Sequence, residues 1–119
     1  MSGKKFDLED RFVSLAANIA LFCKDLPKDF TEQYYGNQLL RSGGSAALNF
    51  GEALGTKTPN DYRFKATLVI KELKESRVNL KILNKISYGS SQVLIELLDE
   101  IEQLVKIVST IIKNKTLKS

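Results

Sequence analysis

The chain has 119 residues, of which 43% are hydrophobic and 27% are charged, a composition that suits one globular domain and excludes a disordered chain or a membrane protein. It contains no histidine and one cysteine, which excludes histidine-based catalytic triads and an internal disulfide, and leaves a zinc site only carboxylate ligands. The net charge of +4 permits an anionic partner without requiring one.

The first element expected along the chain is a helix over about residues 7–26, behind a short basic tail at residues 1–5. Asp7 is the expected N-cap residue, because its carboxylate can accept hydrogen bonds from free N–H groups of the first turn. Pro27 ends the helix, since the residue before a proline avoids helical angles. Apolar residues recur every three or four positions and define one buried stripe: Phe12, Leu15, Ile19, Phe22 and Leu26.

Two features of the sequence concern localisation. The basic tail leads straight into charged sequence without the apolar core of a signal peptide, and no apolar run reaches the ~20 residues of a membrane-spanning helix. Cys23 lies among apolar positions, where it is best explained as a small core residue with an unactivated thiol. We therefore expect a cytoplasmic protein without a membrane segment.

A second helix is expected over about residues 33–55, and its centre contains the adjacent glycines Gly43 and Gly44. Each glycine costs the helix about 1 kcal/mol relative to alanine. Close approach of another helix is the favoured explanation for this cost, and a kink is the alternative. Near the start of the helix, Tyr34 and Tyr35 are either packing anchors, which we favour, or an exposed stacking pair.

A polar stripe runs along this second helix, because Arg41, Ser45, Asn49 and Glu52 follow one another at spacings of four, four and three. It is either a solvated face or a polar seam against a neighbouring helix, which would need charged partners. Glu72 and Glu75 are the partners expected for Arg41 or Arg77, in a structural salt bridge that fixes helix register.

The third helix is expected over about residues 59–87, because Thr58 can cap it and Pro59 suits its first position. One side follows the 4-3 spacing of coiled-coil-like bundles, with Ser76 as its single polar member: Tyr62, Ala66, Val69, Leu73, Ser76, Leu80 and Leu83.

The same helix is basic, with eight Lys or Arg against three acids between residues 57 and 85. Lys74, Arg77, Lys81 and Lys85 share one helical face, and Lys71 lies beside it. This basic face is either a solvated surface or a surface for phosphate contacts with RNA or DNA, which would be salt-dependent and weakly sequence-specific.

The fourth helix is expected over about residues 91–114, and its apolar residues exceed what a narrow seam needs. We therefore expect a subunit interface on it. Four helices joined by short turns predict an all-α fold, an antiparallel up-down-up-down four-helix bundle that forms one domain over residues 1–119. No phosphate loop accompanies the glycine pair, and no catalytic residue, metal or cofactor is predicted.

Four pieces of the chain, in order, resemble the four-helix-bundle family encoded in intervening sequences of bacterial 23S ribosomal RNA genes. Phe6–Arg11 (FDLEDR) is similar to an FDLEER-like opening, and Leu26–Lys28 (LPK) to the family's proline stop. The stretch that begins at Gln38 with QLLRSG resembles the signature second helix. Lys71–Arg77 (KELKESR) resembles the third-helix pattern KELRESR-x-W-L. Gly44 stands where the family usually has Thr, and Asn79 where an aromatic residue is common.

This resemblance implies a left-handed bundle that forms a ring-like homopentamer without known enzymatic activity. A related branch is the accessory protein of diversity-generating retroelements, a basic pentameric bundle that binds the reverse transcriptase and nucleic acid. The leading hypothesis is therefore an oligomeric bundle that binds RNA or a ribonucleoprotein through its basic face. The alternative is a protein-interaction scaffold that binds no nucleic acid. An enzyme is a distant third hypothesis, which would need Arg41, Glu52 and Glu75 together in one pocket.

Overall fold

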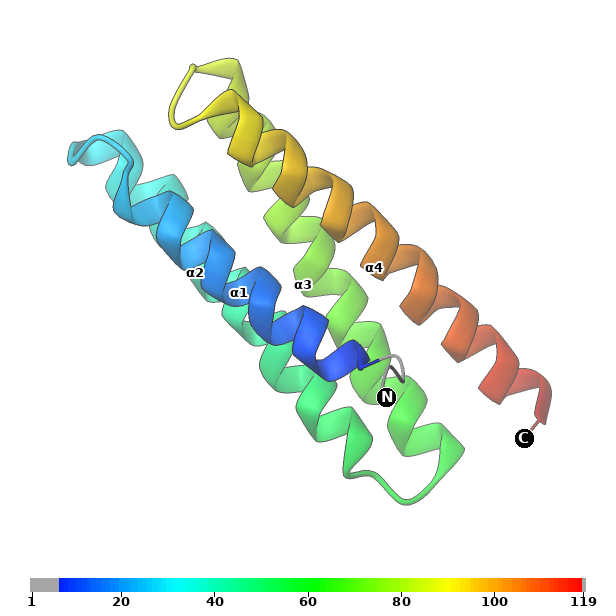
Figure 1. The fold of residues 1–119 in the computed structure, drawn as a ribbon. Helices are drawn as coiled ribbons and strands as arrows, with labels where there is room; N and C mark the ends of the chain where they lie inside the picture. Colours follow the sequence, from blue (N-terminus) through cyan, green and yellow to red (C-terminus); the bar gives the residue numbers. More distant parts are fainter. Residues whose placement is uncertain (1–6, 119) are drawn as a thin grey trace.

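The computed structural model describes residues 7–118, which form four α-helices and, within that range, no β-strand (Figure 1). The helices are α1 (Leu8–Lys24), α2 (Phe30–Leu54), α3 (Pro59–Lys85) and α4 (Ser91–Lys118). The predicted all-α bundle is therefore confirmed. The predicted basic tail at residues 1–5, and Phe6 of the opening motif, lie outside the described residues.

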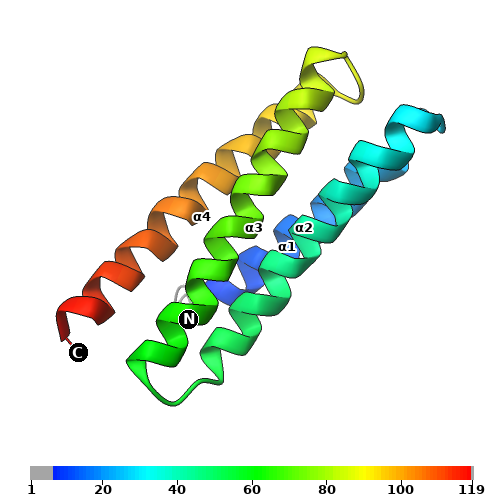
Figure 2. The same ribbon diagram turned by 180° about the vertical axis from the view of Figure 1, so that it is seen from behind.

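Consecutive helices run in opposite directions, so that the α1–α2 and α3–α4 turns lie at one end and the α2–α3 turn at the other (Figure 1). This arrangement is compatible with the predicted up-down-up-down order, and the left-handed twist stays a prediction. Helices α2 and α3 lie side by side and make the most extensive contact of any pair (Figure 2). Helices α1 and α4 also touch, but they make the least extensive contact.

Several helix boundaries differ from the predicted ones. Helix α2 begins at Phe30 rather than near residue 33, because Asp29 Oδ1 accepts a hydrogen bond from Glu32 N at 2.9 Å. Helix α1 ends at Lys24, and α4 continues to Lys118 rather than ending near residue 114. The predicted caps Asp7 and Thr58 do accept the expected hydrogen bonds, from Asp10 N and Asp61 N.

Helix α3 ends at Lys85, two residues earlier than predicted, because Ser87 has a φ of 60°, in the left-handed region. The N–H groups of Ser87 and Tyr88 donate to the carbonyls of Asn84 and Leu83, the two bonds that close a Schellman motif. These bonds satisfy the last carbonyls of the helix and turn the chain into α4.

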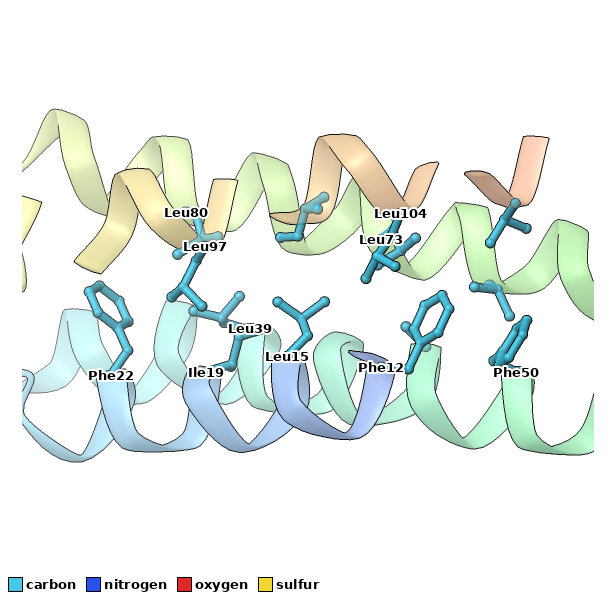
Figure 3. Packing of buried hydrophobic residues seen from close by; sticks show 14 of the residues in the cluster. Phe12, Leu15, Ile19, Phe22, Leu39, Phe50, Leu73, Leu80, Leu97 and Leu104 are labelled. Atoms are coloured by element: carbon cyan, nitrogen blue, oxygen red, sulfur yellow. The ribbon is translucent and has the colours of Figure 1, made fainter. Parts of the chain in front are cut away.

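All four helices contribute apolar side chains to one core, and Figure 3 shows α1 and α2 facing α3 and α4 across it. The rings of Phe12 and Phe50 stack with centroids 4.7 Å apart. Gly43 is buried, and a Cβ atom at this position would lie 2.7 Å from Ile19 Cδ1 of α1, whereas a Cβ atom at Gly44 would meet nothing within 4 Å. The predicted close approach therefore occurs at Gly43 alone, and α2 continues through both glycines as one helix.

Candidate functional site

The contact between α2 and α3 carries a cluster of charges on its outer side. Arg41 Nη2 of α2 lies 3.2 Å from Glu72 Oε1 of α3 and also bonds Glu75 Oε1. Lys71 Nζ lies 3.1 Å from Glu75 Oε2 and 3.9 Å from Glu72 Oε2. Arg41 thus reaches across the helix pair to both carboxylates of α3 and ties the register of α2 to that of α3, whereas Lys71 pairs with them within α3.

The two carboxylates of this cluster differ in burial. The Glu72 side chain is 11% exposed, and its Oε1 atom makes no directed hydrogen bond although the Arg41 nitrogen lies within ion-pair distance. The contact is therefore an ion pair with poor hydrogen-bond geometry. Lys71, followed by Arg41, holds the pKa of Glu75 below its ordinary value. The Glu75 carboxylate therefore contributes to the stability of the fold at pH values above its pKa in the unfolded chain. This contribution is lost as the pH falls through the lowered pKa of the folded state.

The remaining members of the predicted polar seam do not join this cluster. Glu52 instead pairs with Lys65 of α3, with Oε1 2.6 Å from Nζ. Asn49 Nδ2 donates to the Ser45 carbonyl of its own helix at 2.9 Å. The structure therefore brings Arg41, Glu72 and Glu75 together and leaves Glu52 in a separate pair, so these groups do not share one pocket.

Beneath the charged cluster, sequence reasoning missed a buried hydrogen bond between two serines. Ser42 Oγ of α2 and Ser76 Oγ of α3 lie 2.6 Å apart, and both residues are fully buried. Ser76 was recognised as the polar member of an apolar pattern. Its partner Ser42 could have been found from its position three residues after the buried Leu39.

The five predicted nucleic-acid-binding residues separate into two groups. Lys71 is paired with Glu75, and Arg77 Nη1 forms a salt bridge with Glu102 Oε2 of α4 at 3.3 Å. The other three form an exposed row on the outer side of α3 and make no salt bridge within residues 7–118: Lys74, Lys81 and Lys85. We call these three residues the lysine row.

A shallow groove of about 660 Å³ lies beside the lysine row, between α2 and α3. Tyr34 lines it and is 59% exposed as a residue. Its ring centroid lies 4.9 Å from that of Tyr35, and the two rings are nearly perpendicular. Tyr35 is partly buried against the core. The favoured prediction that both tyrosines serve packing is therefore wrong for Tyr34, whose ring extends beyond the bundle core. We call this surface the α2/α3 groove.

A second groove, of about 530 Å³, lies where α1 and α4 approach each other. Its apolar lining includes Leu21, which is 60% exposed, and Val93. Its acidic members are Asp25, Glu96 and Glu100, of which Glu100 accepts a hydrogen bond from Arg11 Nε at 2.9 Å. We call this surface the α1/α4 groove.

Three observations on the described residues concern metal ligands, thiol reactivity and membrane-spanning helices. Over residues 7–118, no group of three or more His, Cys, Asp or Glu side chains lies close enough to hold a metal ion. Burial raises the pKa of the Cys23 thiol to about 11, so that the thiol is protonated at neutral pH. In the same range, none of the helices combines the length and the apolar character needed to cross a bilayer.

Comparisons with known proteins agree on one group of relatives. A family model described as "23S rRNA-intervening sequence protein" matches residues 4–110. The crystal structure of a protein of unknown function from the S23 ribosomal protein family of Bacteroides thetaiotaomicron is similar, with a TM-score of 0.83 and 25% sequence identity. The similarity covers 90% of this chain and 99% of that one. No curated protein matches the chain.

Proposed function

The chain belongs to the 23S rRNA-intervening sequence protein family, and we propose that it is a non-enzymatic, oligomeric helical bundle that binds RNA through the outer face of α3. The observation that carries this proposal is the lysine row. Its three ammonium groups are exposed and unpaired in the described part of the chain, whereas the neighbouring Lys71 and Arg77 are held by carboxylates.

The spacing of the lysine row supports contacts with a phosphate backbone. At a rise of about 1.5 Å per residue, Lys74, Lys81 and Lys85 lie about 10 Å and 6 Å apart along the helix axis. Such spacings are of the order of the distance between nearby phosphates. Binding of this kind releases counterions, so that it weakens as salt is added and shows little sequence preference.

Self-association and a cytoplasmic location belong to the same proposal. Leu21 and Val93 are large apolar residues that are at least 36% exposed and line the α1/α4 groove, which favours a subunit contact there. In the pentamer that the resemblance implies, five chains of +4 would total +20, a charge sufficient to attract nucleic acid. The buried, unpaired thiol of Cys23 suits the reducing cytoplasm.

Replacing Lys74, Lys81 and Lys85 together by Gln should weaken RNA binding roughly tenfold and flatten its salt dependence, because three phosphate contacts are lost. The measurement is fluorescence anisotropy with a labelled RNA hairpin at about 50 mM and about 200 mM salt. The matched control replaces the exposed Lys24, Lys106 and Lys113 by Gln, which removes the same charge from α1 and α4. Equal loss in both triple variants, or no binding by the parent, contradicts the proposal.

The α1/α4 groove favours a second candidate function, a scaffold that binds a partner protein. Its apolar floor and acidic side chains suit an amphipathic helix with lysine or arginine beside its apolar stripe. Asp25 and Glu96 form no salt bridge within the described helices and turns, so both could pair with such a helix.

Under the scaffold hypothesis, Leu21→Glu should abolish capture of one stoichiometric partner protein, and nuclease treatment should leave the complex of the parent chain intact. The exposed Leu48 of α2 provides a matched control, because it is 70% exposed and does not line the groove. Capture that survives Leu21→Glu, or that nuclease removes, excludes the groove as the partner site.

A further inference from the structure

The α2/α3 groove is lined by three kinds of side chain that can bind a nucleotide of a single strand: an aromatic ring, a cation and amides. The exposed ring of Tyr34 offers an aromatic face, and Tyr35 supports it by an edge-to-face contact. Lys74 lies in the groove and is also the first member of the lysine row, so that one cation belongs to both surfaces. Gln38 and Asn79 contribute side-chain amides to the lining.

The negative charge in this groove is already neutralised. Glu75 is the acidic residue of the lining, and its two oxygens are bonded by Arg41 and Lys71. A phosphate that approaches Lys74 therefore meets a compensated carboxylate rather than a free one. Asn79 Nδ2 donates to the Glu75 carbonyl at 3.0 Å, which fixes the amide and leaves its oxygen for another hydrogen bond.

We infer that the α2/α3 groove is a stacking site for an unpaired base, and that the RNA bound by this protein is single-stranded where it meets α2 and α3. An exposed tyrosine can stack on a base only if that base is free of its own stack, which a duplex does not allow. The antiparallel pairing of α2 with α3 puts Tyr34 near the Ile82 end of the groove, so the base lies against Tyr34 there and the strand then follows the lysine row from Lys85 toward Lys74. The inference rests on the proposed function, since it assigns the conformation of the RNA.

The test compares a labelled oligo(U) strand of about twelve nucleotides with a blunt RNA duplex of the same length, at about 50 mM salt. Tyr34→Ala should weaken binding of the strand roughly tenfold and leave binding of the duplex unchanged, because only the strand can stack. Tyr34→Phe should bind the strand like the parent, since stacking needs the ring and not the hydroxyl. Phe64→Ala is the control, because Phe64 is 64% exposed on α3 and does not line the groove.

The outcomes separate the inference from the proposed function. If the Gln variant of the lysine row loses affinity for the strand but Tyr34→Ala does not, the stacking site is wrong and the phosphate-binding face stands. If Tyr34→Ala weakens strand and duplex equally, or Phe64→Ala weakens the strand as much, the effect is not stacking in this groove. If the parent binds neither RNA, both the inference and the proposed function fail.

Discussion

Gly43→Leu is expected to destabilise the fold by roughly 2–3 kcal/mol and to lower the melting temperature by roughly 10 °C. The reason is the position of Ile19, whose Cδ1 atom would lie only 2.7 Å from a Cβ atom at residue 43. A leucine there has three further carbon atoms to place between α1 and α2. The gain in helix propensity of about 0.8 kcal/mol does not offset that overpacking.

Two smaller substitutions test whether the contact with Ile19 causes the expected loss of stability. Gly44→Ala should stabilise the fold by up to about 1 kcal/mol, because the added methyl group meets nothing within 4 Å and the helix gains propensity. Gly43→Ala should become more favourable when Ile19→Val removes the clashing Cδ1 atom. Thermal or urea unfolding of the four chains in this cycle measures the coupling. A Gly43→Leu chain that melts like the parent would disprove this account of α2.

Arg41→Met is expected to destabilise the fold by about 2–3 kcal/mol, the low end for a broken buried pair because the Arg41 side chain is itself 49% exposed. Without the guanidinium, the Glu72 carboxylate stays 11% exposed, with its nearest described cation, Lys71 Nζ, at 3.9 Å. A buried carboxylate whose remaining partner is this more distant lysine of its own helix is the costly product of the substitution. Urea unfolding at neutral pH measures the change in free energy.

Lys65→Met supplies the control on the same helix pair. It breaks the ion pair with Glu52, whose side chain is 58% exposed, and should cost less than about 1 kcal/mol. The double variant Arg41→Met, Glu72→Met should recover most of the lost stability, because two apolar side chains can replace a buried ion pair. If Arg41→Met costs no more than Lys65→Met, Glu72 does not depend on Arg41.

The charged cluster also links stability to the proposed site. Arg41 and Lys71 neutralise Glu75 in the lining of the α2/α3 groove, so that the contacts that fix α2 against α3 also prepare the groove for an anion. We therefore expect Arg41→Met to weaken binding of the RNA strand as well as the fold.

The local signals in the sequence determined the helices. Capping at Asp7 and Thr58, the proline at position 59 and the 4-3 apolar spacing of α3 act within one or two turns, so they can be recognised without knowing the neighbours. The start of α2 at Phe30 also depends on a local signal, the N-cap Asp29, which the apolar spacing used to predict this helix does not include. The family could also be recognised, because its motifs are short strings in a fixed order.

Only the tertiary structure decided which residues of each predicted set act together. Successive residues of a helix point about 100° apart, so that Gly43 meets Ile19 while Gly44 does not, and Tyr34 is exposed while Tyr35 is partly buried. Arg77 belonged to the basic face in the sequence, yet Glu102 of α4 pairs with it. Lys71 is paired within α3 by Glu75, a spacing of four that the sequence contains, but the Arg77–Glu102 distance exists only after α3 and α4 pack.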